Sequence, residues 1–258
     1  MNCLSSVVGY NLGAVAGYLL PRLRSSRSGM AAVPCCIVLL LLAPSIAASS
    51  ASSLCSQQVN EPARDQRYAV MSTVLKRGFL FVQVDVAKVV IRFGERTAEV
   101  LRQAVQGRAP SEQLDDRVAE AAMDSRDALV ELTFERDITL TRFIDEARRS
   151  TERVWKAGVI NRKAYERIRQ LLPFWYGSLR GRGIKKDDRM CYQIRGDELR
   201  TVYVGRDGKV FLNQVNEGDS SCLAVLGGYF VKGSDFRKGL IDSLFRPGAS
   251  DSPETRTH

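Results

Sequence analysis

The hydrophobic pattern changes its period within one segment, residues 128–155. Apolar side chains occupy every second position over 128–134, which predicts a strand with one buried face. After the corner residues 136–138, apolar positions recur every three or four residues, which predicts a helix with Thr139 as its N-cap. The apolar stripe of this helix comprises Leu140, Phe143, Ile144, Ala147, Thr151, Val154 and Trp155. The segment therefore predicts a sheet that carries one long helix.

The same patterns predict the other elements of the chain. Strands are expected at 68–75, 79–86, 89–93, 190–194, 199–204 and 210–214. Helices are expected at 97–105, 162–172, 221–230 and 235–245. Residues 106–127 are polar and are expected to form a loop with a weak helix, and Pro173 is expected to end the helix before it.

Strands that cluster in meanders, with helices inserted between them, predict an α+β fold. We expect an open-faced β-sandwich, in which a mainly antiparallel sheet is covered on one side by a layer of helices. The 258-residue chain, with 45% hydrophobic and 26% charged residues, has the composition of globular material. We expect one domain at 61–246, a targeting segment at 1–60 and a disordered tail at 247–258.

The first sixty residues are expected to form a targeting signal. They contain no acidic residue, and residues 22–29 are rich in arginine and serine, which is typical of an import signal. The apolar run 31–48 is interrupted by Pro34 and Pro44 and allows two interpretations. It is either a membrane anchor behind a mitochondrial presequence, or a signal-peptide core cleaved near 45–49, with a plastid transit peptide as a variant. Localisation is therefore organellar or secretory, with mitochondrion, plastid and secretory pathway all open.

Charge and histidine content disfavour several classes of function. The net charge of +9 is distributed so that basic residues such as Arg148 and Arg149 alternate with Asp145 and Glu146, as on a solvated helix face. We therefore expect no nucleic-acid partner. The single histidine, His258, lies at the C-terminus, which disfavours histidine-dependent catalysis and histidine-ligated metals. We expect neither a metal nor a cofactor.

The cysteines show no metal-site or redox spacing. Three of the six lie in the N-terminal segment, as Cys3, Cys35 and Cys36. We interpret Cys191 and Cys222 as buried thiols, and a disulfide between them is the alternative in an oxidising compartment.

Three segments carry a resemblance to a known family. Residues 132–147 read Leu-Thr-Phe-Glu-Arg-Asp-Ile-Thr-Leu-Thr-Arg-Phe-Ile-Asp-Glu-Ala, and residues 76–87 read Lys-Arg-Gly-Phe-Leu-Phe-Val-Gln-Val-Asp-Val-Ala. Together with 183–208 and 229–245, they resemble the chalcone isomerase-like family in order and spacing. That family includes plant flavonoid enzymes, plastid fatty-acid-binding proteins and organellar proteins without assigned activity. The resemblance covers about residues 70–245.

The resemblance implies a ligand cleft between the sheet and the helices. Arg77 matches the family arginine that anchors an anionic or ketone oxygen of the ligand, and Phe79 and Phe81 would form the wall around its tail. A guanidinium binds a carboxylate with two parallel hydrogen bonds, and an apolar setting strengthens them. The alternative is that Arg77 is a solvated turn residue beside Lys76.

Family members that cyclise chalcones have a tyrosine, a lysine and an asparagine on the corner helix. The matching positions here hold Thr139, Arg142 and Glu146. The tyrosine that orients the attacking phenolate is absent, which argues against flavanone formation. The alternative interpretation of Arg142 is an exposed salt bridge with Glu146.

Several further side chains have two interpretations. We favour a structural role for the corner pair Arg136-Asp137, since an aspartate just before a helix complements its dipole. An aromatic set either fringes the cleft or belongs to the core: Trp155, Phe174, Trp175, Tyr176, Tyr203 and Tyr229.

The sequence thus predicts a non-catalytic protein of the chalcone isomerase-like type that binds a hydrophobic carboxylate ligand, such as a fatty acid. One alternative is an isomerase of the intramolecular lyase class, acting on a chalcone-like substrate. Another is a structural subunit of an organellar membrane complex, attached through residues 31–48. The oligomeric state is left open.

Overall fold

The computed structural model describes residues 68–79 and 82–245, and at 77–79 and 82–83 only the backbone. The predicted targeting segment 1–60 with its apolar run 31–48, and the predicted tail 247–258, lie outside the described residues. Among the helices that are described, none is both long and apolar enough to cross a membrane.

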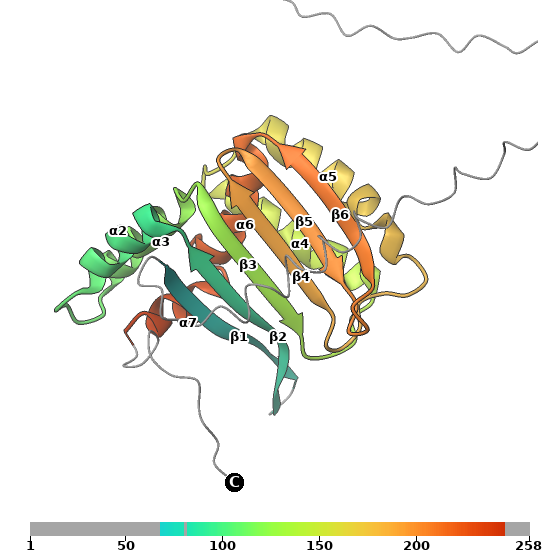
Figure 1. Ribbon diagram of the computed structural model, residues 1–258, viewed down its shortest axis with the longest axis horizontal. Coiled ribbons are helices and arrows are strands. Elements are labelled where there is room, and N and C mark those ends of the chain that lie inside the picture. Colours follow the sequence, from blue (N-terminus) through green and yellow to red (C-terminus); the bar gives the residue numbers. More distant parts are fainter. Residues whose placement is uncertain (1–67, 80–81, 246–258) are drawn as a thin grey trace, which may run out of the picture. The chain divides into compact units, whose positions relative to one another are not determined.

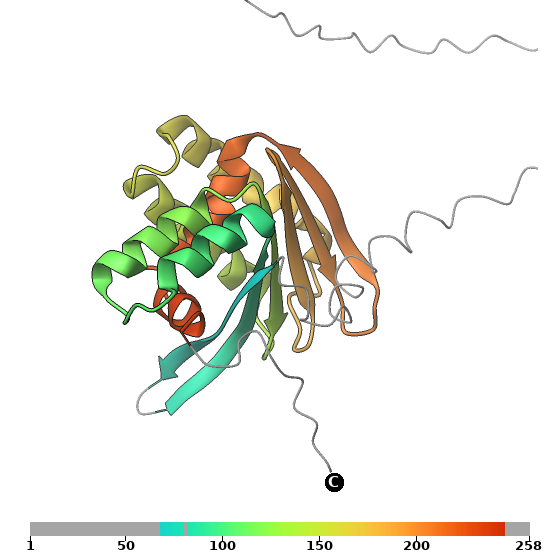
Figure 2. The same ribbon diagram turned by 60° about the vertical axis from the view of Figure 1, so that its left-hand side comes forward.

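Six antiparallel strands form one sheet in which each strand pairs with the next along the chain (Figure 1). The strands are β1 (Ala69–Phe79), β2 (Val82–Phe93), β3 (Asp127–Phe134), β4 (Arg189–Arg195), β5 (Glu198–Val204) and β6 (Val210–Glu217). The helices are α2 (Glu95–Val105), α3 (Glu112–Met123), α4 (Leu140–Lys156), α5 (Arg162–Trp175), α6 (Asp219–Phe230) and α7 (Arg237–Ser243). Figure 2 shows the helices gathered on one face of the sheet. The predicted α+β, open-faced architecture is confirmed.

The corner between β3 and α4 forms as the pattern predicts. Thr139 caps α4, and its hydroxyl accepts a hydrogen bond from the backbone N–H of Arg142 at 3.3 Å. A backbone bridge joins Ile138 to Ile184. Asp137 accepts a hydrogen bond from the backbone N–H of Lys186 at 2.9 Å, which together with an ion pair to Lys185 lowers the pKa of its carboxyl. Asp137 is thus held by structural contacts.

The N-terminal strands differ from the prediction. The sequence suggested three strands at 68–75, 79–86 and 89–93, but the chain forms only β1 and β2, joined at residues outside the described set. β2 passes through Lys88 without a break because this side chain is exposed on the surface of the sheet. β1 and β2 pair over their full length, with a register shift at Leu75 and Lys76.

Two helices are longer than the pattern predicts. α3 is a complete helix and not a loop with a weak helix, because Ser111 caps it and Leu114, Val118 and Ala122 pack into the core. α5 continues through Pro173 to Trp175 instead of ending at residue 172. A proline this close to the C-terminal end removes only one backbone hydrogen bond, and the last turn still closes, with the N–H of Tyr176 donating to the Leu172 carbonyl at 3.2 Å.

The two faces of the sheet separate Cys191 from Cys222, so the pairing considered from sequence is wrong. Cys222 is a free thiol on α6, packed in the helical layer, and its burial raises its pKa to about 11. Cys191 packs on the opposite face with Leu129 and Val202. Cys191 is disulfide-bonded, and not the buried thiol that we expected, and its partner lies outside the described residues.

A buried ionic network joins the β3–α4 corner region to β5. Asp188 is fully buried and accepts hydrogen bonds from Arg182 at 2.5 and 2.9 Å and from the Tyr203 hydroxyl at 2.6 Å. Two backbone N–H groups, of Lys185 and Arg206, complete its shell. Burial raises the pKa of Asp188, but these hydrogen bonds outweigh it, so that the pKa lies below the ordinary aspartate value.

We predict that Asp188→Asn lowers the free energy of unfolding by about 3 kcal/mol at pH 7, because it leaves Arg182 without its buried counter-charge. Urea denaturation measures this difference. The folded-state pKa of Asp188 is depressed, so its stabilisation is present above the unfolded pKa of about 3.9 and is lost as pH falls through the folded value. The gap between variant and wild type should therefore narrow in acid.

The neighbouring residue supplies the control for this experiment. Asp187 is exposed and has a positive φ of 66°, which asparagine tolerates. Asp187→Asn should leave the unfolding free energy almost unchanged. Equal effects of the two substitutions, or a gap that widens in acid, would contradict the role assigned to Asp188.

Candidate functional site

A cavity of about 800 Å³ lies between the sheet and the helices. Its sheet side is formed by side chains from β1 to β6, and its roof by α4, α5, α6 and the corner at residues 136–139. Most of the wall is apolar: Leu75, Val84, Val86, Ala87, Leu132, Phe134, Phe143, Ala147, Ile168, Leu172, Val225 and Phe236. The cavity has the size and lining of a site for a hydrophobic small molecule.

Phe143 connects the roof to the sheet within this wall. Its ring meets Phe134 of β3 edge-to-face at 6.2 Å and Tyr176 at 4.9 Å, in geometries that aromatic pairs prefer. The Phe143 position follows directly from the apolar stripe of α4. The corner and the stripe together hold the roof helix over the cavity.

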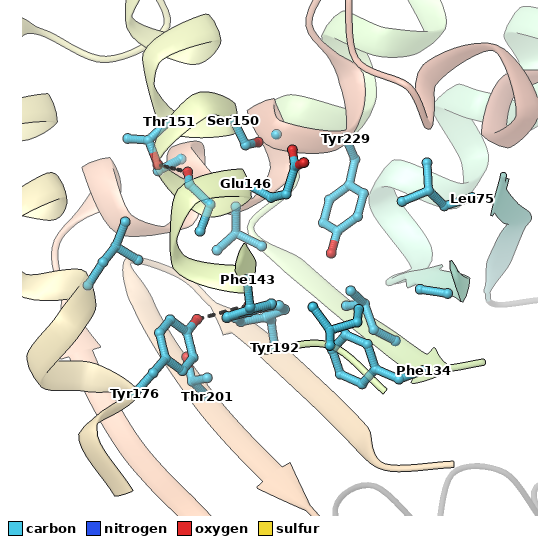
Figure 3. A pocket seen from close by; sticks show the side chains of 18 of the residues that line it. Leu75, Phe134, Phe143, Glu146, Ser150, Thr151, Tyr176, Tyr192, Thr201 and Tyr229 are labelled. Carbon is cyan, nitrogen blue, oxygen red and sulfur yellow. Dashed lines mark hydrogen bonds between the residues drawn. The ribbon is translucent and has the colours of Figure 1, made fainter. Parts of the chain in front are cut away.

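Two tyrosines form a hydrogen-bonded pair in the wall (Figure 3). Tyr176, at the C-terminal end of α5, and Tyr192, on β4, place their hydroxyl oxygens 3.1 Å apart. Burial raises the pKa of Tyr176 to about 12, and it raises the pKa of Tyr192 well above its ordinary value. Both phenols are therefore protonated at physiological pH and can donate hydrogen bonds.

Tyr229 of α6 is a third phenol in the same space. Its side chain is only 7% exposed, its ring packs on Phe236 at 5.1 Å, and its hydroxyl points into the cavity (Figure 3). This hydroxyl makes no hydrogen bond to any residue that the structure describes. Burial raises its pKa far above the ordinary tyrosine value, so it too remains a donor.

The position of Tyr229 depends on a close crossing of α4 and α6. A Cβ atom at Gly227 would lie 2.8 Å from Cγ1 of Val154, and one at Gly228 would lie 2.7 Å from Oγ of Ser150. Both distances are shorter than real contacts. At Gly227 the opposing atoms belong to the branched Val154 side chain, so this position requires glycine, whereas at Gly228 the Ser150 hydroxyl could rotate away. The two glycines directly precede Tyr229 and set how deeply it enters the helical layer.

Charged side chains also line the cavity: Arg136, Asp137, Arg142, Glu146, Arg153 and Asp235. Arg142 is exposed. The Nε atom of Arg153 is buried and has no hydrogen-bond partner among residues 68–79 and 82–245. The lining therefore contains three arginines and three carboxylates.

The structure brings together three of the residues that the resemblance pointed to. Thr139, Arg142 and Glu146 all line the cavity, at the corner and on the first turns of α4. Glu146 pairs with Arg149 at 2.9 Å, and within the described part of the chain the salt bridge considered between Glu146 and Arg142 is not formed. Whether these residues bind a ligand stays a prediction.

The other predicted site residues cannot be placed in the same way. Arg77 and Phe79 belong to β1, but their side chains, and the whole of Phe81, lie outside the described residues. The backbone pairs Arg77 with Val84, which lines the cavity.

The aromatic residues with two interpretations divide into separate groups. Trp175, Tyr176 and Tyr229 line the cavity. Trp155 instead stacks on Tyr165 at 4.8 Å, Phe174 is 74% exposed, and Tyr203 belongs to the network around Asp188.

Tyr192 was missed by the sequence analysis, although its position carried a signal. On β4 it lies between Met190 and Ile194 in the period-two row that faces the helices, and both neighbours are fully buried. A tyrosine hydroxyl among apolar core side chains needs either a hydrogen-bond partner or a cavity beside it. Thr201, Gln214 and Asn216 line the same cavity from β5 and β6.

Comparison with known proteins adds little support for the predicted family or ligand. No family model and no curated protein matches the chain. Among solved structures, a fatty-acid-binding protein of Arabidopsis thaliana is similar over 68% of this chain and 89% of its own, with 13% identity and a TM-score of 0.45. A likeness at this level identifies neither family nor ligand, so the chalcone isomerase-like resemblance stays a prediction from the sequence.

We predict that Gly227→Ala destabilises the fold, because its added methyl group meets Val154 on α4. The steric cost of about 1–3 kcal/mol exceeds the gain of about 1 kcal/mol in helix propensity. Chemical denaturation of a double-mutant cycle measures it. The same substitution should cost less in a Val154→Ala background, where the opposing methyl groups are removed. An identical loss in both backgrounds would show that the crossing is not as close as described.

Proposed function

We propose that the protein binds a hydrophobic small molecule with an acidic group, such as a fatty acid, and does not convert it. The cavity of about 800 Å³ between the sheet and the helices is the observation that carries this proposal. Ligand sites of about 300–1,000 Å³ with mainly apolar walls and a few polar groups are typical of small-molecule binding proteins. The apolar wall would enclose the tail of the ligand.

The arginines in the lining support an acidic head group. Arg142 and Arg153 come from the same helix and both line the cavity, where a guanidinium can bind a carboxylate. Two of the cavity carboxylates, Asp137 and Glu146, are paired with basic residues outside the lining. This pairing supports Arg142 and Arg153 as the proposed contacts of an anionic ligand.

We retain Arg77 as a further proposed anchor, with Phe79 and Phe81 as wall residues. The support is the register of β1, since directly opposite positions of an antiparallel pair share a face of the sheet. Position 77 lies opposite Val84, a cavity residue.

The residue at the start of the corner helix supports the proposal that the ligand is bound without being converted. Thr139 occupies the position at which the chalcone-cyclising enzymes of the resembled family have a tyrosine, and its hydroxyl serves as the cap of α4. A threonine in this role lacks both the reach and the acidity of a phenol.

We also propose that residues 1–60 direct the protein to an organelle or the secretory pathway. The support is the sequence of this segment, which lacks acidic residues and contains an arginine- and serine-rich stretch and an apolar run. The mature N-terminus, determined on protein from its native cell, tests the two interpretations of residues 31–48. A start after residue 48 supports a cleaved signal, and a start before residue 31 supports an anchor.

Displacement of a fluorescent fatty acid by dodecanoic acid and by its methyl ester tests the head-group assignment. The variants are Arg153→Gln, Arg142→Gln and Arg77→Gln. We expect the variant that removes the contacting arginine to weaken binding of the acid by about tenfold and to leave binding of the ester unchanged. Arg167→Gln, at an exposed position of α5 outside the cavity lining, is the matched control. If no cavity arginine distinguishes acid from ester, the anionic head group is wrong.

A second variant tests whether the tail occupies the cavity. Ala147→Trp fills the wall of α4 and should abolish binding of both ligands, whereas Ala157→Trp, exposed at the end of the same helix, should not. If the two variants bind the ligands equally well, the ligand does not occupy the cavity.

A further inference from the structure

The three cavity tyrosines form a polar group that the proposed head-group contacts do not use. They come from different elements, Tyr176 from the end of α5, Tyr192 from β4 and Tyr229 from α6, and Figure 3 shows them around one space. The hydroxyl oxygens of Tyr176 and Tyr192 lie 3.1 Å apart, and the Tyr229 hydroxyl points into the same cavity. The three phenols can therefore contact one ligand.

This group has hydrogen-bond donors to spare. Tyr176 and Tyr192 share one hydrogen bond, so one of their two O–H groups remains for another acceptor. The Tyr229 hydroxyl, on a side chain more than nine-tenths buried, has no partner among the residues described. The Tyr229 hydroxyl faces the cavity, so a ligand that fills this space and displaces water should offer it an acceptor.

The surroundings determine which acceptor fits. Tyr176 packs against Phe143 and Tyr229 against Phe236, and the pKa values of all three phenols are raised chiefly by burial. The phenols themselves are neutral donors, so a carboxylate bound by them alone would lose its hydration without gaining a counter-charge, which is costly. A carbonyl oxygen carries no charge and has two lone pairs, one for each available O–H.

We propose that Tyr229, with the Tyr176–Tyr192 pair, is a binding site for an uncharged carbonyl oxygen, so that the natural ligand is an oxo-substituted hydrophobic molecule. This inference rests on the proposed function, because it assigns a second contact within the same cavity. The arginines contact an acidic end, and the phenols contact a ketone within the apolar part of the ligand. A plain hydrocarbon tail would leave both donors unsatisfied.

Benzophenone and diphenylmethane are matched probes for this site, since they differ mainly in the carbonyl group. We expect Tyr229→Phe to weaken benzophenone binding about tenfold, the effect of one hydrogen bond, and to leave diphenylmethane binding unchanged. The infrared carbonyl stretch of bound benzophenone should lie at lower frequency in the wild type than in Tyr229→Phe. Tyr165→Phe, a substitution on α5 outside the cavity lining, is the control and should change neither value.

The outcomes separate this inference from the proposed function. A Tyr229-dependent preference for benzophenone, in a protein that binds no dodecanoic acid, supports the carbonyl site and rejects the fatty-acid assignment. Dodecanoic acid binding, with both aromatic probes affected equally by Tyr229→Phe or not at all, keeps the proposed function and overturns the carbonyl site. Failure of all three probes to bind the wild type overturns both.

Discussion

The close crossing of α4 and α6 is the constraint on which the cavity depends. Gly227 and Gly228 present no side chain to Val154 and Ser150, so α6 packs directly against these side chains of α4. The corner after β3 fixes the other end of α4 through its cap and its backbone bridge. Between these fixed points the roof is held apart from the sheet, and Tyr229, directly after the glycines, is carried into the space that remains.

The lining of this space is electrostatically uneven, and the unevenness orients a ligand. Arg142 and Arg153 contribute charge from one helix, while Tyr176, Tyr192 and Tyr229 contribute only neutral donors among aromatic and aliphatic side chains. A charged group is stable where a counter-charge and water are available, and an uncharged oxygen is stable where only donors are present. The arginines therefore suit an acidic group and the phenols an uncharged oxygen, which is the basis for proposing an oxygenated acid.

Local patterns allowed the sequence to predict the corner and the sheet, but not the cavity. The change of period and the cap at Thr139 are encoded by adjacent residues and form as expected. The helix α3 was underestimated because its sequence is mostly polar and only Leu114 and Val118 are large apolar residues in its buried stripe. Lys88 hid the continuity of β2 because its charge is exposed on the sheet surface. An inward tyrosine such as Tyr192 gives the same pattern whether its hydroxyl meets a side chain or an empty space. That distinction arises only from the packing of distant elements.

The central claim is that the space under the roof helices holds a hydrophobic molecule. Native mass spectrometry of the full chain, purified without added lipid from the cell that makes it, tests this most directly. The account predicts a bound molecule with the mass of an acid that contains a further carbonyl oxygen. Denaturation should release this molecule, and Ala147→Trp should abolish its binding. A wild-type protein at the mass of the polypeptide alone, or a bound molecule that Ala147→Trp retains, would contradict it.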